Sequence, residues 1–212
     1  APSTIPSIAC SAFLSSVPIL RWGREKMKML LFPPLCLHCQ EPCEKDLCVG
    51  CSATLVLLEP EGKTIHAALP QRGAASTLLA ALRSGETRLA TSLAGFLVTQ
   101  LEALHWPFPE VLVPLPRQWP EAFSSTLEAS FLLAQGMASL LRCPVLRLLK
   151  RHLSHPLSPL FSSKCPPLLA ERRILVVADQ FDEAVLKSAQ RALEEVDAHS
   201  VRVLAFLKPG EG

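Results

Sequence analysis

The sequence lacks a long apolar run, a strong net charge and any internal repeat. No stretch reaches the roughly eighteen uncharged apolar residues that a membrane span needs, so we expect no membrane insertion. Because 21 Lys and Arg face 19 Asp and Glu, the net charge of +2 excludes a strongly basic nucleic-acid tail and an acidic solvating chain. Nine Gly and 19 Pro follow no period, which excludes collagen-like and repeat architectures.

What is present is typical of a soluble globular protein. Hydrophobic residues make up 49% of the 212 positions, which is too many for a disordered chain. That length allows one ordinary domain plus a small appendage. Residues 8–20 form a short apolar stretch, but the positive residues follow it, which is the reverse of a secretory signal. We therefore interpret residues 1–29 as an extension ahead of a start at Met27 or Met29, leave open whether 1–26 belong to the native product, and expect a cytoplasmic protein.

The cysteines are concentrated in one segment. Five of the eight fall within residues 36–51, namely Cys36, Cys39, Cys43, Cys48 and Cys51. A secreted disulfide scaffold spreads its cysteines through the chain, so this clustering favours a metal site in a reducing compartment.

Two CxxC pairs within this segment predict a zinc site. Cys36 and Cys39 form the first pair, and Cys48 and Cys51 form the second. Four thiolates satisfy tetrahedral Zn²⁺ and leave no open position, so the predicted site is structural and folds a segment too small to fold alone. Cys43, or His38 inside the first pair, remains an alternative ligand, and a redox pair is the weaker competing interpretation.

The rest of the chain predicts an α/β fold with a parallel sheet. Leucines recur at helical spacing over residues 74–104, with a break at Ser84-Gly85. Two strand–helix–strand units follow, at 110–116, 123–142 and 144–149, and at 173–179, 182–196 and 200–207. Their strands are almost unbroken apolar runs, which is typical of a parallel sheet covered on both faces. Ligands bind at the carboxyl ends of such strands, so the loops at 116–126 and 179–184 are the candidate binding loops.

Several motifs resemble one family. Leu31-Phe-Pro-Pro-Leu-Cys-Leu-His-Cys39 and Leu47-Cys-x-x-Cys51 resemble the amino-terminal zinc finger of the ComF family of bacterial competence proteins. Arg83-Ser-Gly85, Val113-Pro-Leu-Pro116, Leu132-Leu-Ala134 and Ile174-Leu-Val-Val-Ala-Asp179 resemble segments of its type I phosphoribosyltransferase domain. The resemblance implies a zinc finger over 30–58 and a phosphoribosyltransferase-like domain over 59–212. In the family, two acids at the end of the last of these strands hold the ribose hydroxyls, a Thr-Thr-Gly loop binds the 5-phosphate, and Mg²⁺ bridges the pyrophosphate.

This sequence departs from the family pattern at both halves of that site. The strand ends in Ala178-Asp179 rather than Asp-Asp, and Asp182-Glu183-Ala184 replaces Thr-Thr-Gly. Two carboxylates therefore stand where a dianionic phosphate would bind. A second signature, Arg-Gly-Phe-Asn-Gln, aligns with Ser125-Thr-Leu-Glu-Ala129. We interpret Asp179 as a catalytic remnant or a helix-capping acid, and Asp182, Glu183 and Ala184 as a degenerate phosphate loop.

The resulting hypothesis is a catalytically degenerate ComF-like protein that acts as a binding module in DNA uptake. The resemblance implies single-stranded DNA and competence proteins as partners. The CxxC spacing predicts structural zinc as cofactor, and the altered loop predicts no binding of phosphoribosyl pyrophosphate. One alternative is an active phosphoribosyltransferase that uses phosphoribosyl pyrophosphate and Mg²⁺, and another is a pure protein-interaction module. A modest basic patch at Arg147, Lys150, Arg151, Arg172 and Arg173 is the candidate DNA contact, and solvated charges are its plainer interpretation.

Overall fold

The computed structural model describes residues 34–61, 64–116, 128–151, 161–163, 171–195 and 198–209. The chain divides into two compact units, Ala1–Cys48 and Val49–Gly212. The boundaries predicted from the sequence, at 29 and 58, stay predictions. The 1–29 extension lies outside the described residues, as do residues 153–167, which are rich in Pro and Ser, apart from 161–163, and most of the 116–126 loop.

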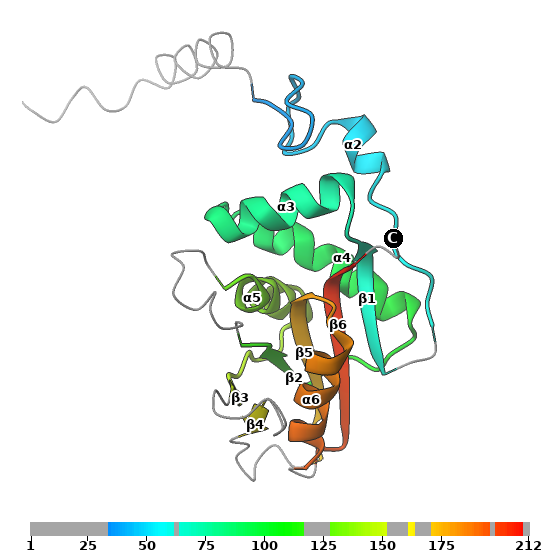
Figure 1. Cartoon of the computed structure of the whole chain (residues 1–212), viewed down its shortest axis with the longest axis vertical. Helices are drawn as coiled ribbons and strands as arrows, with labels where there is room; N and C mark the ends of the chain where they lie inside the picture. The colour runs from blue at the N-terminus through cyan, green and yellow to red at the C-terminus, as the bar shows by residue number, and fades with distance from the viewer. Residues whose placement is uncertain are drawn as a thin grey trace, which may run out of the picture. The chain divides into compact units, whose positions relative to one another are not determined.

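The second unit is built around a parallel sheet (Figure 1). Its strands are β1 (Ile65–Pro70), β2 (Val111–Pro114), β5 (Arg173–Gln180) and β6 (Ser200–Lys208). They lie in the order β1-β6-β5-β2, and every neighbouring pair is parallel. The parallel-sheet α/β architecture predicted from the sequence is therefore confirmed.

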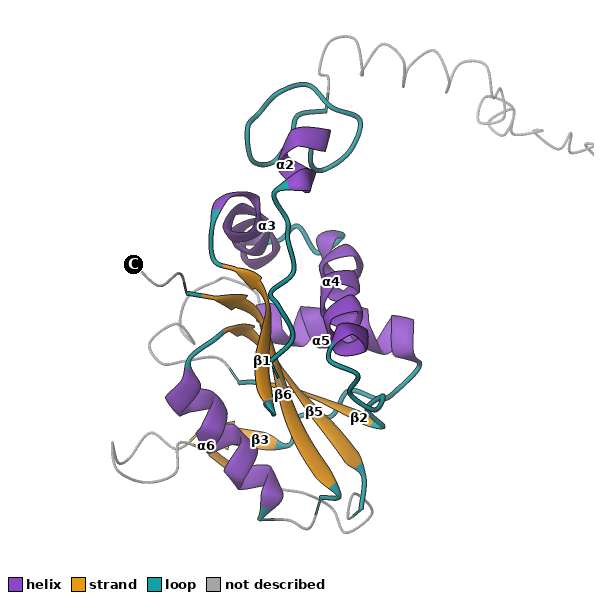
Figure 2. Ribbon diagram, turned by 90° about the vertical axis from the view of Figure 1, so that its right-hand side faces the viewer, coloured by secondary structure: helices purple, strands orange, loops and turns teal. Residues whose placement is uncertain are grey.

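Helices cover both faces of the sheet (Figure 2). α4 (Leu89–Ala103) and α5 (Ala129–Leu141) lie on one face and α6 (Glu183–Glu194) on the other, while α3 (Gly73–Ser84) and the short α2 (Val49–Ala53) complete the described helices. Side chains alternate along each strand, so Val176 and Val203 form a core with Leu186 of α6. Leu175 and Leu204 are buried on the opposite face, which α4 and α5 cover. None of the described helices is long and apolar enough to cross a membrane.

The structure corrects one of the strand predictions and adds strands that the sequence did not predict. Residues 144–149 do not form a strand; Val145 makes a single parallel bridge to Leu112, beside the open edge of β2. Leu149 instead begins β3 (Leu149–Arg151), which pairs antiparallel with β4 (Phe161–Ser163) in a separate sheet. Strand β1 has no counterpart in the prediction. The helix expected over 123–142 is described only from Ala129, because residues 117–127 lie outside the described part of the chain.

The connections reverse direction between β2 and β5. From β2 the chain passes through α5 to Val145 on the outer side of β2, whereas from β5 it passes through α6 to β6 on the other side. Neighbouring parallel strands that depart in opposite directions leave an opening at their carboxyl ends. The fold therefore places the ends of β2 and β5, at Pro114 and Gln180, where α/β proteins bind ligands.

Candidate functional site

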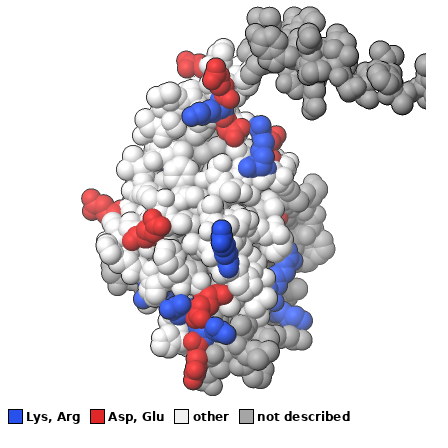
Figure 3. Space-filling model, turned by 180° about the vertical axis from the view of Figure 1, so that it is seen from behind, with Lys and Arg blue, Asp and Glu red and all other residues white. Residues whose placement is uncertain are grey.

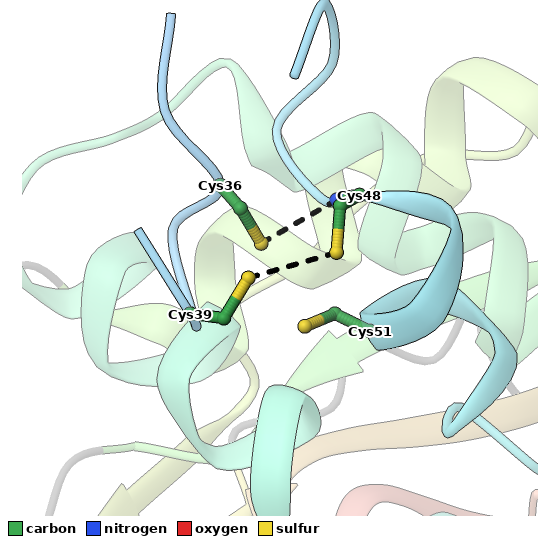
Figure 4. A group of neighbouring side chains, drawn as sticks. All are labelled: Cys36, Cys39, Cys48 and Cys51. Carbon is green, nitrogen blue, oxygen red and sulfur yellow. Dashed lines mark hydrogen bonds between the residues drawn. The ribbon is translucent and has the colours of Figure 1, made fainter. Parts of the chain in front are cut away.

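Four cysteine side chains converge in the segment that contains both CxxC pairs (Figure 4). The sulfur atoms of Cys36, Cys39, Cys48 and Cys51 all lie within 4.8 Å of one another. The Sγ atoms of Cys39 and Cys48 are 3.6 Å apart. In a tetrahedral zinc site with Zn–S bonds near 2.3 Å, neighbouring sulfurs are about 3.8 Å apart. The four predicted metal ligands therefore come together in a geometry that fits one zinc ion.

The backbone around the first pair is folded into a tight knuckle. Cys36 donates its backbone N–H to the carbonyl of Glu41 at 2.9 Å, and Gln40 donates to the carbonyl of Cys36 at 2.9 Å. Gln40 has a φ of 61°, so the chain turns back through a left-handed residue immediately after Cys39. This turn directs both thiols of the pair to the same side.

The first thiol is placed in surroundings that favour the metal-binding thiolate. Cys36 is buried, and the backbone N–H of Cys48 lies 3.4 Å from its sulfur. Hydrogen bonding from the Cys39 backbone, with a smaller contribution from that of Cys48, lowers the pKa of Cys36 to about 6. Thiolate is the form that ligates zinc, so these backbone groups favour metal binding. With four thiolates as ligands, zinc would supply folding energy and no catalysis.

Cys43 does not belong to the cluster. Its thiol donates a hydrogen bond to the carbonyl of Lys45 at 2.8 Å, and burial raises its pKa. The spacing left open whether Cys43 or His38 replaces one of the four ligands. Among the described residues, neither belongs to the four-residue group.

A second cluster of polar side chains surrounds Asp179 at the end of β5. Arg83 of α3 forms an ion pair with one oxygen of this carboxylate, and its Nε lies 3.1 Å from the same oxygen. Ser130, in the first turn of α5, donates its hydroxyl to the other oxygen at 3.1 Å. The Arg83 and Asp179 side chains are 28% and 22% exposed, so the pair is largely shielded from water. Both oxygens of the Asp179 carboxylate are thus engaged by the protein itself.

The predicted phosphate loop begins a helix instead of forming an open cradle. Asp182 is the N-cap of α6, and its Oδ1 accepts hydrogen bonds from the backbone N–H groups of Ala184 and Val185 at 3.1 and 3.2 Å. These are the donors that a phosphate at a helix N-terminus would use. Glu183 pairs with Lys187 one turn later, at 2.6 Å. The carboxylate of Asp182 therefore occupies the anion position at this helix end.

Ala178 contributes no polar group to the site. It is fully buried in the core beneath α6, on the opposite face of β5 from the Arg83 contact. Of the second altered signature, Ser125–Ala129, only Glu128 and Ala129 are described. Ser130 lies one residue beyond this signature, and only its position in the first turn of α5 could have indicated its role.

The predicted basic patch is largely neutralised by acidic partners. Arg147 pairs with Glu128 at 3.0 Å. Glu110 accepts a hydrogen bond from the Arg172 guanidinium at 2.8 Å and forms an ion pair with the Arg173 guanidinium at 3.5 Å. On the face shown in Figure 3, positive and negative side chains are interspersed over a mostly uncharged surface. Lys150 is exposed, and the side chain of Arg151 lies outside the described part of the structure.

Comparison with known proteins gives structural similarities alone. No model of a protein family matches the sequence, and no curated protein matches it. Among solved structures, the chain is similar to the L. donovani hypoxanthine-guanine phosphoribosyltransferase, with 16% identity, a TM-score of 0.36, and coverage of 65% of this chain and 71% of that one. It is also similar to a point mutant of the Trypanosoma cruzi hypoxanthine phosphoribosyltransferase, with 15% identity, a TM-score of 0.38, and coverage of 59% and 68%.

Proposed function

We propose that this chain is a zinc-stapled, ComF-like protein with a phosphoribosyltransferase-like fold that binds rather than catalyses. In this proposal it is cytoplasmic and acts in DNA uptake, with single-stranded DNA and competence proteins as partners. Two features support it. One is the closed four-cysteine cluster, and the other is Asp179, an acid at the carboxyl end of β5, where the connections between strands reverse direction.

The main support for a loss of catalysis is that the Asp179 carboxylate already binds other side chains of the protein. A carboxylate that holds ribose hydroxyls needs free lone pairs directed at the ligand. Here Arg83 approaches one oxygen through two nitrogens and Ser130 donates to the other, so three of the roughly four acceptor positions are already taken. A ligand would first have to break a shielded ion pair, which costs more than displacing water from an open carboxylate.

The helix end beside it adds a second obstacle. The Asp182 carboxylate already accepts from the N–H groups at the start of α6. A dianionic phosphate placed there would compete for the same donors and would be repelled by the carboxylates of Asp182 and Glu183. At an effective dielectric near 20, two unit charges about 4 Å apart interact by roughly 4 kcal/mol.

Calorimetric titration with phosphoribosyl pyrophosphate and Mg²⁺ tests this directly. We expect no heat of binding for the natural chain. The triple variant Asp182→Thr, Glu183→Thr, Ala184→Gly restores the loop chemistry without placing a charge at the buried Ala178. It should gain weak affinity, and Lys187→Thr serves as a matched control one turn along the helix. Micromolar binding by the natural chain would replace the proposal with an active phosphoribosyltransferase that uses Mg²⁺.

Single-stranded DNA provides the test of the binding role. Because the net charge is only +2 and Arg147, Arg172 and Arg173 of the basic patch pair with acids, we expect weak binding to a fluorescent oligonucleotide that falls steeply as salt is added. Lys150→Gln should weaken it, whereas Lys187→Gln, whose ammonium pairs with Glu183, should have a smaller effect. An absence of binding at low salt would favour the pure protein-interaction module.

A further inference from the structure

A partly buried arginine near the amino end of β6 carries a charge that the described part of the chain leaves unpaired. Arg202 lies beside Leu175 in the sheet register and two residues before Leu204, on the face that α4 and α5 cover. Its Nη1 atom is buried, and no described residue accepts a hydrogen bond from it. Burial lowers the pKa of Arg202. Because an unpaired buried charge destabilises a fold, this guanidinium is a candidate binding group.

The turn after α4 places an aromatic ring against this arginine. The helix ends in a Schellman motif, in which His105 donates its backbone N–H to the Glu102 carbonyl at 2.9 Å. Trp106 donates its own to the Leu101 carbonyl at 3.3 Å. His105 is the left-handed residue of the motif, with a φ of 51°. The Arg202 guanidinium carbon lies 5.1 Å from the centre of the Trp106 ring. The ring therefore holds the guanidinium by a cation–π contact and leaves its hydrogen-bond donors unused.

Residues 106–109, the aromatic segment, also present an exposed phenylalanine. Phe108 is 52% exposed and stands between Pro107 and Pro109. Each proline fixes its own φ and restricts the residue before it, so this segment loses little backbone freedom when it binds a partner. Trp, Tyr and Arg are the residues most enriched at binding hot spots. Together with the arginine, the segment offers one cation and two aromatic side chains on a stiff backbone.

The charges at this edge of the sheet favour a single carboxylate as the ligand. Arg172 and Arg173 already pair with Glu110. Glu102, in the last turn of α4, is exposed and negative. A nucleic acid gains its affinity from several cations that contact successive phosphates, and Arg202 alone does not supply them. One guanidinium is enough to bind one carboxylate through two parallel hydrogen bonds.

We propose that Arg202, Trp106 and Phe108 form a docking site for a peptide segment of a partner protein that carries one Asp or Glu beside an apolar residue. The carboxylate accepts from the guanidinium, and the apolar residue packs against Phe108. Because no hydrogen bond anchors the guanidinium within the described chain, it turns toward the carboxylate without breaking another contact of that kind. The site lies at the amino edge of the sheet, opposite the edge that holds Asp179, so the proposal goes beyond the proposed function and does not depend on it.

The test uses the full chain and two unlabelled peptides with blocked ends, followed by ligand-observed NMR. In Gly-Leu-Asp-Leu-Gly the carboxylate is the one charge, and in its twin Asn replaces Asp. We expect the Asp peptide to bind with an affinity that falls as salt is added, and the Asn peptide to bind about tenfold more weakly or less. Equal binding of the two peptides overturns the proposal, as does an absence of Asp-peptide binding up to several millimolar.

Matched variants locate the binding. Arg202→Gln removes the charge and should weaken binding of the Asp peptide by about tenfold, whereas Arg191→Gln, at an exposed position on α6, should leave it unchanged. Phe108→Ser changes an exposed side chain, so that variant serves if Arg202→Gln fails to fold, and it should weaken binding of both peptides. Asp-peptide binding that is unchanged in the folded Arg202→Gln or Phe108→Ser variant would place the peptide elsewhere and overturn the assignment.

Stability and DNA binding provide two independent checks. Arg202→Leu removes an unpaired buried charge, so it should not lower the urea midpoint of the free chain. A lower midpoint would show that an acceptor within the chain stabilises the arginine, and would overturn the proposal. Arg202→Gln should bind single-stranded DNA as the natural chain does, and weaker DNA binding would assign the arginine to phosphate instead. Failure of the phosphoribosyl pyrophosphate titration leaves these outcomes unaffected, so the two proposals fail separately.

Discussion

Asp179 shows how a single side chain can hold three elements together. Its carboxylate joins β5 to α3 through Arg83 and to α5 through Ser130. Asp179→Asn keeps an acceptor for Ser130 but leaves the shielded guanidinium without its counter-charge. We expect the free energy of unfolding to fall by about 1–3 kcal/mol, measured by urea denaturation.

A matched substitution separates this effect from a general loss of charge. Glu183→Gln breaks an exposed pair with Lys187 one turn away, and should cost less than about 0.5 kcal/mol. If Asp179→Asn proves equally mild, the carboxylate is available to a ligand and the catalytically degenerate interpretation loses its main support.

Glu110 predicts a pH dependence of stability at the opposite end of the sheet. Hydrogen bonds from the Arg173 backbone N–H at 3.1 Å and the Arg172 guanidinium at 2.8 Å hold the pKa of Glu110 below its ordinary value of 4.5. A folded-state pKa below the unfolded one contributes stability above the unfolded value, and that contribution disappears as the pH falls through the folded value.

Comparison with Glu110→Gln isolates this contribution. The difference in free energy of unfolding between the natural chain and the variant should be full near neutral pH and should shrink as the pH falls below 4.5. Subtraction removes the contributions of Glu171 and His199, which line the same hollow. A difference that stays constant into the acid range would contradict the assignment.

Between elements, the contact of α4 with α5 depends on one glycine. A Cβ added at Gly136 would lie 2.6 Å from the Ala90 carbonyl oxygen and 2.8 Å from the Ala94 Cβ. We expect Gly136→Ala to destabilise the fold by about 1–3 kcal/mol, because the backbone of α4 would have to shift.

Gly95 of α4 provides the matched control for this prediction. A Cβ there meets nothing within 4 Å, so Gly95→Ala should stabilise the helix by up to about 1 kcal/mol. Both variants are compared by chemical denaturation. Equal effects of the two substitutions would show that helix propensity, rather than close packing, decides the outcome at Gly136.

The strands differ in how well local sequence predicts them. β5 and β6 are predictable because buried apolar residues run unbroken from Ile174 to Ala178 and from Val203 to Leu207. β1 is Ala-rich and has one β-branched residue, so its extended form depends on pairing with β6, where Ala67 lies beside Ala205. Residues 144–149 look equally apolar, yet one bridge to Leu112 is all that this segment contributes to the main sheet. Pairing partners distant in sequence decided both cases.

The four-cysteine cluster and the cluster around Asp179 also differ in how well the local sequence predicts them. The zinc ligands are predictable because two CxxC pairs eight residues apart bring four thiols together through local turns. The partner of Asp179 is not predictable from spacing, because Arg83 lies 96 residues away and reaches it only once α3 has packed at the carboxyl edge. Asp182 is partly predictable. Its capping role follows from its place before a helix, and the structure adds that its carboxylate accepts hydrogen bonds from two backbone N–H groups at the start of α6.

For the whole molecule, the metal content is the simplest prediction. The purified chain should contain about one zinc per molecule by elemental analysis, because its four thiols satisfy a tetrahedral ion. Cys39→Ser should lose the zinc, whereas Cys43→Ser should retain it, since the Cys43 thiol donates to Lys45 and lies outside the four-residue group. Zinc-free protein that was never exposed to a chelator, or loss of zinc in Cys43→Ser, would contradict the assignment.

The position of β6 has a consequence for the order in which the chain folds during synthesis. Among the described strands β6 comes last, and it lies between β1 and β5, so within the described sheet β1 has no strand partner until residues 200–208 leave the ribosome. Until then the facing edges of β1 and β5 are open, and open strand edges are sites of aggregation. A nascent chain stalled before residue 200 should therefore need a chaperone, and one released after residue 208 should close its sheet without help.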